Sequence, residues 1–335
     1  MTDGVQALLN EVRKQREGLK LPELLRRQFQ DSVQVVNNEE KPEDSKPVLR
    51  VMQWNLLAQA LSQGDDNFVL CPLEALQWEH RKLHILEEIL TYNATIVCLE
   101  EVDHFTFMHE TLGKAGYDGS FFPKPDSPCL YSDVNYGPDG CAVFWKKDQV
   151  SLIQKKGVVL KDEQREPTNQ VAVICKFTHL LLHKEFFVAV THLKSKTPYW
   201  QMRHEQGKYL EQTLTKSVTP STPLVVCGDF NAEPSEQVYA TFRKSELKLG
   251  SAYCYLSDKL EEPAFTTWKV RGGPLGKENC ETAQCIDYVF FTTDFIRPVS
   301  LLQLPTGEQI GKDRLPSMTY PSDHLSLVVD FVFCG

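Results

Sequence analysis

The sequence VVCGDFN, residues 225–231, is a short apolar run that ends on Gly-Asp-Phe-Asn. The run predicts a buried strand, and a spacing of two residues predicts that Asp229 and Asn231 share one face at the strand end. Hydrolysis of a phosphate ester uses such a pair, because a carboxylate can orient or deprotonate the attacking water while an amide binds a phosphoryl oxygen. The alternative interpretation is an Asx turn, in which both side chains only satisfy their own backbone.

The composition predicts a globular chain with an acidic balance. Of 335 residues, 41% are hydrophobic and 24% are charged, and the formal net charge is -9 at pH 7. A long polyanion is normally held by a broad basic surface, so a nucleic acid is not expected as the main substrate. Cys98, Cys175 and Cys227 lie in apolar runs, which predicts buried thiols, a reducing compartment and a cytoplasmic location. No apolar run reaches the length of a membrane span, and a monomer is expected.

Residues 1–46 are predicted to form an N-terminal helical extension followed by a charged linker. Apolar residues recur with partial helical spacing, and the linker sequence NNEEKPEDSKP occupies residues 37–47. The Arg-containing amphipathic start permits a mitochondrial address, although its acidic residues argue against one. Residues 47–335 contain no second linker and are expected to form one domain.

Strand and helix patterns alternate along that domain. Strands are expected at 48–55, 94–99, 117–122, 140–145, 169–175, 185–190, 286–291 and 322–331, and helices at 72–90, 203–212 and 235–244. The mixture of continuous and alternating apolar strands suits a sandwich of sheets covered outside by helices. The Pro/Gly/Asp-rich loop 123–139 is long for a structural connection, which favours a functional role.

Polar side chains collect at the predicted strand ends. Each of them alone has an ordinary explanation, such as a turn cap or a solvated charge. Together, carboxylates, amides and imidazoles at many strand ends indicate a pocket for a metal and a phosphate. An oxygen-rich set without the Cys/His spacing of zinc sites predicts Mg²⁺, with Mn²⁺ as a substitute. The residues are Asn55, Glu101, His192, Asp229, Asn231, Asp287, Asp323 and His324.

Five segments resemble the endonuclease/exonuclease/phosphatase superfamily: QWNLLAQ at 53, CLEEVDHF at 98, GDFNAEPSE at 228, IDYVF at 286 and PSDHLSLVVDF at 321. The resemblance implies an α+β protein with the DNase I-like fold, a four-layer αββα sandwich of two mixed sheets flanked by helices. It also implies that residues 47–335 are a catalytic domain for Mg²⁺-dependent phosphoester hydrolysis. Loops such as FFPKPDSPCL and THLKSK are similar to those of the deadenylase-related branch.

The resemblance implies a metal site around Glu101. Glu101 matches the metal-binding glutamate of the family, and Asn55 supports that ligand. Asp323 is a further candidate for the metal or phosphate site. The neighbouring Glu100 stands where the family more often has glutamine, and it is not the expected ligand.

The resemblance assigns the catalytic steps to five side chains. Asp229 matches the residue that aligns or deprotonates the attacking water, and Asn231 beside it contacts the phosphoryl oxygens. His324 matches the histidine on the scissile phosphate, and Asp287 orients its ring. His192 is expected to stabilise the charge that develops on the phosphate.

The resemblance implies that NADP⁺ and NADPH are the substrates and lose their 2′-phosphate to give NAD⁺ and NADH. A poly(A)-specific 3′ exoribonuclease is the main alternative, and a non-catalytic protein that keeps the pocket as a ligand sensor is another. A few lysines suit a compact dinucleotide better than a long poly(A) tract, which needs stacking platforms along a basic groove. One of them, Lys196, replaces a frequent arginine, and lysine makes a point contact instead of a bidentate one. The substrate-binding candidates are Lys124, Pro125, Asp126, Asn169, His192, Lys194, Lys196, Asp229, Asn231 and His324.

Overall fold

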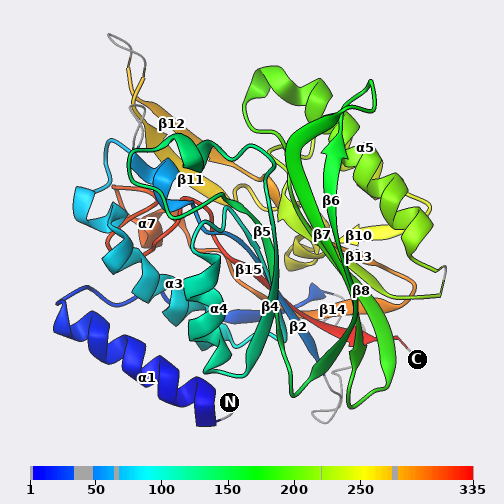
Figure 1. Ribbon diagram of the computed structural model, residues 1–335, viewed down its shortest axis with the longest axis horizontal. Helices are drawn as coiled ribbons and strands as arrows, with labels where there is room; N and C mark the ends of the chain where they lie inside the picture. The colour runs from blue at the N-terminus through cyan, green and yellow to red at the C-terminus, as the bar shows by residue number, and fades with distance from the viewer. Residues whose placement is uncertain (1–2, 34–47, 64–67, 220, 274–277, 335) are drawn as a thin grey trace.

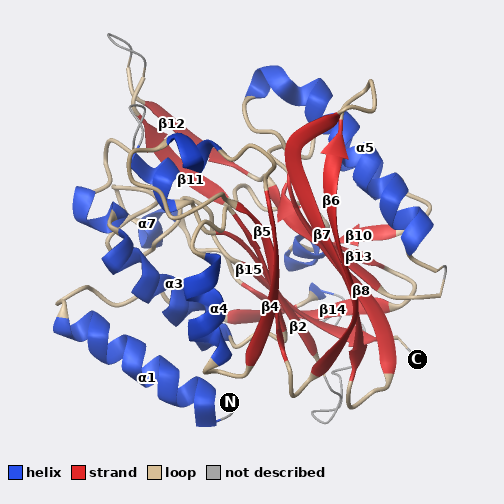
Figure 2. Cartoon of the chain, in the orientation of Figure 1, coloured by secondary structure: helices blue, strands red, loops and turns tan. Residues whose placement is uncertain are grey.

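Two β-sheets face each other in the centre of the computed structural model, and helices cover both outer faces (Figures 1 and 2). The structure describes residues 3–33, 48–63, 68–219, 221–273 and 278–334. The predicted four-layer αββα sandwich is therefore confirmed. The linker predicted at 37–47 lies outside the described residues.

The first sheet has seven strands in the order β1-β14-β15-β2-β3-β5-β4. Its parallel pair consists of β2 (Leu49–Asn55) and β3 (Ile96–Glu100), with Asn55 opposite Glu100. The other five strands pair antiparallel, and they are β1 (Phe29–Asp31), β4 (Tyr117–Pro123), β5 (Gly140–Lys146), β14 (Ile296–Leu302) and β15 (Leu327–Phe333).

The second sheet has six strands in the order β10-β13-β9-β8-β7-β6. Its parallel pair consists of β8 (Lys184–His192) and β9 (Leu224–Asp229), with His192 opposite Asp229. The carboxyl ends of parallel strands meet at one edge, so each sheet brings two polar strand ends together. The remaining strands are β6 (Val150–Lys161), β7 (Pro167–His179), β10 (Leu249–Ser251) and β13 (Asp287–Thr292), and β11 (Thr267–Arg271) forms a separate ribbon with β12 (Cys280–Gln284).

Three apolar layers hold the sandwich together. One layer lies between the sheets, a second lies between the first sheet and its helices, and a third lies under the helices of the second sheet. The helices are α1 (Asp3–Gly18), α3 (Trp78–Tyr92), α4 (Phe105–Gly113), α5 (Trp200–Ser217), α6 (Gln237–Arg243) and α7 (Gly307–Ile310). Short 3₁₀ turns occur at η1 (Gln59–Gln63), η2 (Leu73–Leu76), η3 (Pro128–Tyr131), η4 (Thr197–Tyr199) and η5 (Ala252–Leu256).

The prediction of one continuous helix at 72–90 was wrong, because Gln77 has an extended backbone that separates η2 from α3. Cys98, Cys175 and Cys227 are buried free thiols, as predicted. Within the described ranges, no helix has the length and apolar character needed to cross a membrane.

The N-terminal segment packs against the first sheet. Helix α1 buries its apolar stripe against α3, and β1 pairs with β14 at the sheet edge. Between them, the buried Arg27 donates to Glu88 of α3 at 2.5 Å and to the Ser326 carbonyl oxygen at 2.8 Å. The boundary at residue 46 stays a prediction, but the residues before it add a helix and a strand to the packed fold.

Candidate active site

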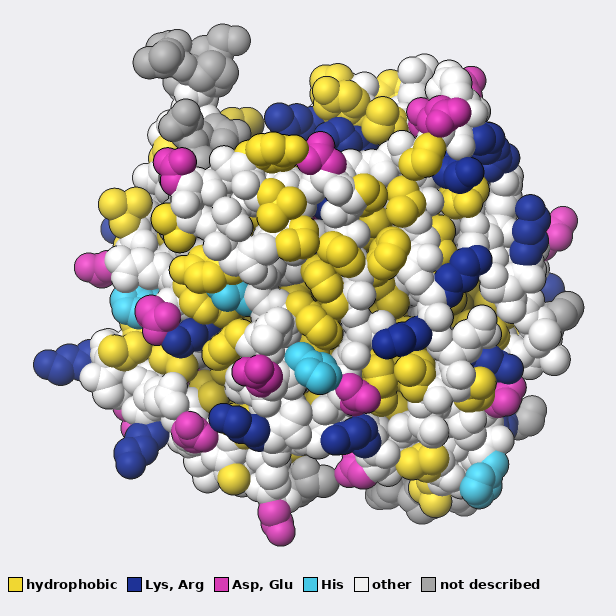
Figure 3. Space-filling view, in the orientation of Figure 1, with side chains coloured by type: hydrophobic (Ala, Val, Ile, Leu, Met, Phe, Trp, Pro, Cys, Tyr) yellow, Lys and Arg dark blue, Asp and Glu magenta, His cyan; other side chains and the backbone are white. Residues whose placement is uncertain are grey.

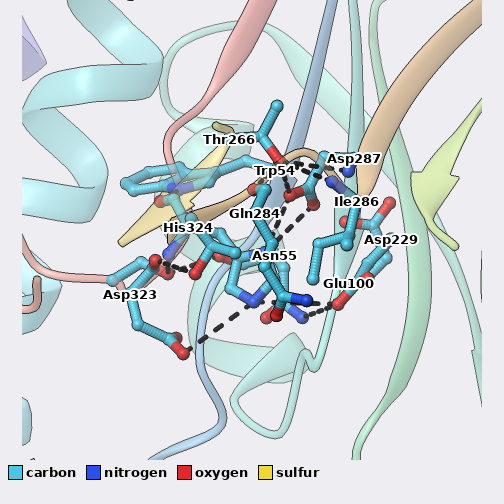
Figure 4. Close-up of polar contacts among 12 residues, drawn as sticks. Trp54, Asn55, Glu100, Asp229, Thr266, Gln284, Ile286, Asp287, Asp323 and His324 are labelled. Atoms are coloured by element: carbon cyan, nitrogen blue, oxygen red, sulfur yellow. Dashed lines mark hydrogen bonds and ion pairs between the residues drawn. The ribbon is translucent and has the colours of Figure 1, made fainter. Parts of the chain in front are cut away.

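Polar strand ends from the two sheets meet at one end of the sandwich (Figure 4). Asn55 at the end of β2 donates through Nδ2 to Asp229 Oδ2 at 2.9 Å and to Glu101 Oε1 at 3.3 Å. His192 at the end of β8 places Nε2 3.5 Å from the same Asp229 oxygen. The structure thus brings Asn55, Glu101, His192 and Asp229 together, as their positions at strand ends indicate.

Asp229 and Asn55 each use one oxygen for a turn and leave the rest of the side chain for the site. Asp229 Oδ1 accepts the Asn231 backbone N–H at 2.8 Å, and Asn55 Oδ1 accepts the Leu57 N–H at 2.9 Å. The Asx-turn interpretation is therefore correct for the backbone, and it fixes the direction in which the remaining atoms point. Gly228 permits this packing, because a Cβ there would lie 2.1 Å from the Thr191 carbonyl oxygen.

Asn231 departs from the expected strand geometry. It lies beyond β9 with φ 50°, so the alternation that predicted a face shared with Asp229 does not extend to it. Its Nδ2 donates to the Leu193 carbonyl oxygen at 3.1 Å, which leaves the second amide hydrogen without a partner among the described residues.

His324 and Asp287 form a buried pair. His324 Nδ1 lies 2.9 Å from Asp287 Oδ2, and that oxygen also accepts the Thr266 hydroxyl at 2.6 Å. His324 Nε2, on the opposite edge of the ring from Nδ1, lies 3.7 Å from Asp229 Oδ2. Burial opposes protonation, but Asp287, Asp323 and Asp229 outweigh it and raise the pKa of His324 to about 9. The His324 imidazole is therefore protonated on both ring nitrogens and positively charged at neutral pH.

The other two titrating groups of the centre are shifted by burial. Burial raises the pKa of Asp229 to about 7, with Asp287 adding to the effect and His324 opposing it. Burial, with Lys124 and His324 nearby, holds the pKa of His192 well below its usual value, so this ring is neutral at pH 7. The site thus combines a carboxylate near its own pKa, a cationic imidazole and a neutral one, which is a set suited to moving a proton.

Glu101, the metal ligand expected from sequence, lies beside Asn55. Asp229, Asp287 and His324 form a second group whose ligand atoms lie within 4.8 Å of one another. Glu101 is partly exposed, and its backbone has φ 54°, a strained conformation that is concentrated at functional sites. Its oxygens accept from Asn55 and from the Ala58 N–H at 3.0 Å, which fixes the carboxylate and leaves lone pairs free. Mg²⁺ is commonly held by one or two carboxylates plus water and substrate phosphate, so these residues fit the ion.

Glu100 has a different environment from its neighbour. Its side chain is fully buried, and burial together with Asp287 and Asp229 raises its pKa well above the usual range. Gln53 donates to Glu100 at 2.8 Å and to Asp287 Oδ1 at 3.2 Å, so a buried amide links Glu100 to the histidine pair. Glu100 is thus a buried support inside the site, and its environment differs from that of the partly exposed Glu101.

Asp323 is engaged by cations of the β11 strand. Its Oδ2 lies 2.5 Å from Lys269 Nζ and 3.9 Å from Arg271 Nη2. Burial favours the neutral acid, but Lys269, His324 and Arg271 outweigh it and lower the pKa of Asp323. The carboxylate is therefore ionised, and one of its oxygens is already neutralised by Lys269.

The predicted lysines surround the mouth of the centre. Lys124 is buried, lies 2.6 Å from Asp139 Oδ2, and its pKa is raised by Asp139 and Glu101 against the effect of burial. Lys194 is partly exposed, with Nζ 4.8 Å from the ring of Tyr199. Burial lowers the pKa of Lys194, and the charges of Lys196 and Lys124 lower it further, which shows that the three lysines are close enough to repel one another.

Asp126 and Asn169 connect the long loop to β7. Asn169 Oδ1 accepts the Asp126 N–H at 2.8 Å, and Asn169 Nδ2 donates to the Asp126 carbonyl oxygen. Asp126 Oδ1 also accepts the Tyr131 hydroxyl at 2.5 Å. Pro125 is exposed, and no interaction of its side chain is recorded among the described residues. These hydrogen bonds of Asp126 with Asn169 and Tyr131 fix the loop next to Lys124.

Four residues of the site were missed by sequence analysis, namely Gln53, Asp139, Thr266 and Lys269. Each acts on a predicted residue from another element: Gln53 and Thr266 hold Asp287, Asp139 holds Lys124, and Lys269 holds Asp323. Gln53 and Lys269 lie inside recognisable segments, QWNLL and TTWK, but their partners follow only from the tertiary fold.

The sequence is similar to one protein family and to several individual proteins. The profile of the Endonuclease/Exonuclease/phosphatase family matches residues 52–324. Nocturnin of Rattus norvegicus is 49% identical over 293 residues, which cover 86% of this chain and 67% of that protein. The Ccr4 3′-5′-exoribonuclease subunit of the CCR4-Not complex of Saccharomyces cerevisiae is 26% identical over 90% of this chain and 41% of its own.

A solved structure has the same architecture. The human Nocturnin catalytic domain with a bound sulfate anion superposes with a TM-score of 0.75 and 40% sequence identity, covering 92% of this chain and 98% of that domain.

Proposed function

Because the chain belongs to the endonuclease/exonuclease/phosphatase family and is a metal-dependent hydrolase of its deadenylase-related branch, we propose that it removes the 2′-phosphate from NADP⁺ and NADPH. The observation that carries the proposal is that Lys124 and Lys194 act electrostatically on each other and on His192 of the centre, with Lys196 also acting on Lys194. A dinucleotide 2′-phosphate ester carries a pyrophosphate near the scissile group, and clustered lysines bind such grouped anions.

In the proposed reaction, Asp229 orients the attacking water and accepts its proton. Its Oδ2 is the oxygen that faces the two histidines, because Oδ1 accepts the Asn231 backbone N–H. A pKa of about 7 lets the carboxylate be ionised before attack and protonated after it. Asn55 holds Oδ2 from the opposite sheet at 2.9 Å, which restricts the position of the water.

The two histidines are proposed to act on the phosphoryl oxygens. The cationic His324 presents Nε2 toward the space in front of Asp229, where it would donate to a phosphoryl oxygen and stabilise its growing charge. Asp287 keeps the ring in place through Nδ1. The neutral His192 would donate from the other side through Nε2, with Asn231 contributing its remaining amide hydrogen.

Glu101, supported by Asn55, is the proposed ligand of a divalent cation, and Asp323 is a secondary candidate. When bound, Mg²⁺ would neutralise phosphate charge and assist the leaving oxygen. The carboxylate of Glu101 lies near the charge of Lys124, so a cation held by Glu101 and the ammonium group of Lys124 would both act on the phosphate.

Removal of poly(A) is the second candidate, and the similarity to the Ccr4 exoribonuclease subunit favours it. Both reactions use the same centre and differ in what binds outside it. The net charge of -9 and the small lysine cluster favour the dinucleotide.

The test is phosphate release from NADP⁺ and NADPH, and shortening of 5′-labelled oligo(A), by purified protein in Mg²⁺. A Glu101→Ala variant prepared in parallel controls for contaminating phosphatases. Release from both dinucleotides with intact oligo(A), absent in the variant, is the expected result. Shortened oligo(A) with untouched NADPH would replace the proposal by the exoribonuclease.

A further inference from the structure

A groove between strand β6 and helix α5 has a basic lining. Its volume is about 480 Å³, and Lys156, Arg165 and Lys216 line it together with Tyr209, Gln212 and Ser217. No carboxylate from the described part of the chain lines it, although acidic residues outnumber basic ones in this protein. None of the residues placed in the active site belongs to the groove. Figure 3 shows several Lys and Arg side chains on the side of the molecule where α5 lies, with others spread over the rest of the face.

The three cations of the groove are free to bind a ligand. All three side chains are exposed, and none forms an ion pair within the residues that the structure describes. Other lysines on the neighbouring surface are paired, since Lys208 of α5 lies 2.9 Å from Glu205 and Lys176 of β7 lies 2.6 Å from Glu185. Lys176 and Lys208 are therefore neutralised by carboxylates, whereas the three cations of the groove have no ion pair among the described residues.

Arg165 is held in place before any ligand arrives. It lies in the β6–β7 turn with φ 66°, a left-handed backbone that glycine or asparagine adopts more readily. The turn is fixed by the Arg165 N–H bond to the Asp162 carbonyl oxygen at 3.1 Å. The guanidinium donates to Gln212 Oε1 at 3.1 Å and lies 5.8 Å from the ring centre of Tyr209, which leaves further N–H groups for an acceptor.

The spacing of the cations suits a ligand with more than one phosphate. Gln212, which contacts Arg165, and Lys216 are one helical turn apart, or about 6 Å along α5. Lys156 lines the same groove from β6. Two phosphates of one molecule can therefore meet separate cations. A single phosphate would leave at least one cation without a partner.

We propose that this groove is a second, non-catalytic binding site for a ligand that carries two or more linked phosphates. A small polyphosphate and the backbone of a single-stranded RNA share that chemistry. The site is independent of the reaction proposed above, because it lies outside the centre and needs no metal.

The test is calorimetric titration of the full chain with inorganic tripolyphosphate in EDTA, which suppresses metal-assisted binding at the active site. The charge-reversed variant Lys156→Glu/Lys216→Glu is compared with Lys14→Glu/Lys114→Glu, a matched change at exposed lysines of α1 and α4 over the other sheet. The groove variant is expected to bind at least tenfold more weakly, and the matched variant within twofold of the wild type. All three proteins should unfold at the same temperature, since only exposed side chains change.

Fluorescence anisotropy with a labelled single-stranded oligo(U) distinguishes the two sources of phosphate. RNA binding that falls tenfold in the groove variant would identify a nucleic acid, and tripolyphosphate binding without RNA binding would identify a small polyphosphate. With three cations engaged, the logarithm of the RNA affinity should fall with the logarithm of salt concentration with a slope of roughly -2. Absence of binding to both probes, an equal loss in the two charge-reversed variants, or a loss caused by Lys194→Glu alone would overturn the proposal.

Discussion

Lys124 offers a test that separates a structural role from a substrate-binding role. Its ammonium group pairs with the fully buried Asp139 at 2.6 Å, and it is also the most enclosed cation at the mouth of the site. A substitution of Lys124 alone therefore affects both the stability of the fold and the binding of substrate. We predict that Lys124→Met lowers both stability and activity, and that Lys124→Met/Asp139→Asn restores stability without restoring activity.

The expected magnitudes follow from burial of the pair. Removal of one partner leaves a buried charge without compensation and costs about 3–5 kcal/mol of unfolding free energy. The second substitution, Asp139→Asn, removes that charge. The amide oxygen of the new asparagine can still accept the hydrogen bond that the Ser127 hydroxyl donates to Asp139 Oδ1. The double variant should therefore be less stable than the wild type by only about 1 kcal/mol of unfolding free energy. Loss of a charge-assisted contact with the substrate costs about 1.5–3 kcal/mol, which corresponds to a roughly 10- to 100-fold lower kcat/KM for NADPH.

Urea unfolding followed by fluorescence measures the first quantity, and phosphate release from NADPH measures the second. Asp139→Asn alone is the matched control, because it keeps the lysine while it removes the buried acid. A single Lys124→Met variant as stable as the wild type would refute the account of the buried pair. A stable double variant with unchanged kcat/KM would refute the substrate-binding role of Lys124.

Three further predictions concern the metal, the protons and the N-terminal segment. EDTA should abolish phosphate release and Mg²⁺ restore it in the wild type, whereas Glu101→Ala should stay inactive in excess Mg²⁺ at an unchanged unfolding temperature. The pH profile of kcat/KM should rise near pH 7 as Asp229 ionises and fall near pH 9 as His324 loses its proton. Asp287→Asn removes the carboxylate that raises the His324 pKa, so the alkaline limb should move to lower pH, and an unmoved limb would contradict the assignment. Arg27→Met should cost about 3–5 kcal/mol in urea unfolding, because its buried carboxylate partner loses its counter-charge, and a loss below about 1 kcal/mol would contradict this.

Strands with apolar runs could be predicted from sequence in the centre of a sheet, and β4 could be predicted at its edge. Residues 225–227 and 288–291 are such apolar runs, and both lie in central strands of the second sheet. Strand β6 was missed because it lies at the edge of that sheet, where its middle residues are exposed and Gln154, Lys155 and Lys156 interrupt the apolar pattern. Strand β1 was missed because three residues give no periodic pattern, and only pairing with β14 makes them a strand.

The site was predictable to the extent that its residues end strands. Asn55, His192 and Asp229 end β2, β8 and β9; parallel pairing brings His192 beside Asp229, and packing of the two sheets brings Asn55 to them. The residues that tune them could not be predicted. Asp139 meets Lys124 from the far end of a loop, and Lys269 reaches Asp323 from a separate ribbon, so neither pairing is encoded in local spacing.

The hydrogen bond from Asn55 to Asp229 crosses from one sheet to the other, so the centre is assembled only after the sheets have docked. A folding intermediate in which one sheet has formed alone would have native-like strands but no aligned water and no hydrolysis. The rate at which activity recovers during refolding therefore reports sheet docking, while the rate of change in circular dichroism reports strand formation. A delay between the two signals would measure how long the sheets exist before they meet.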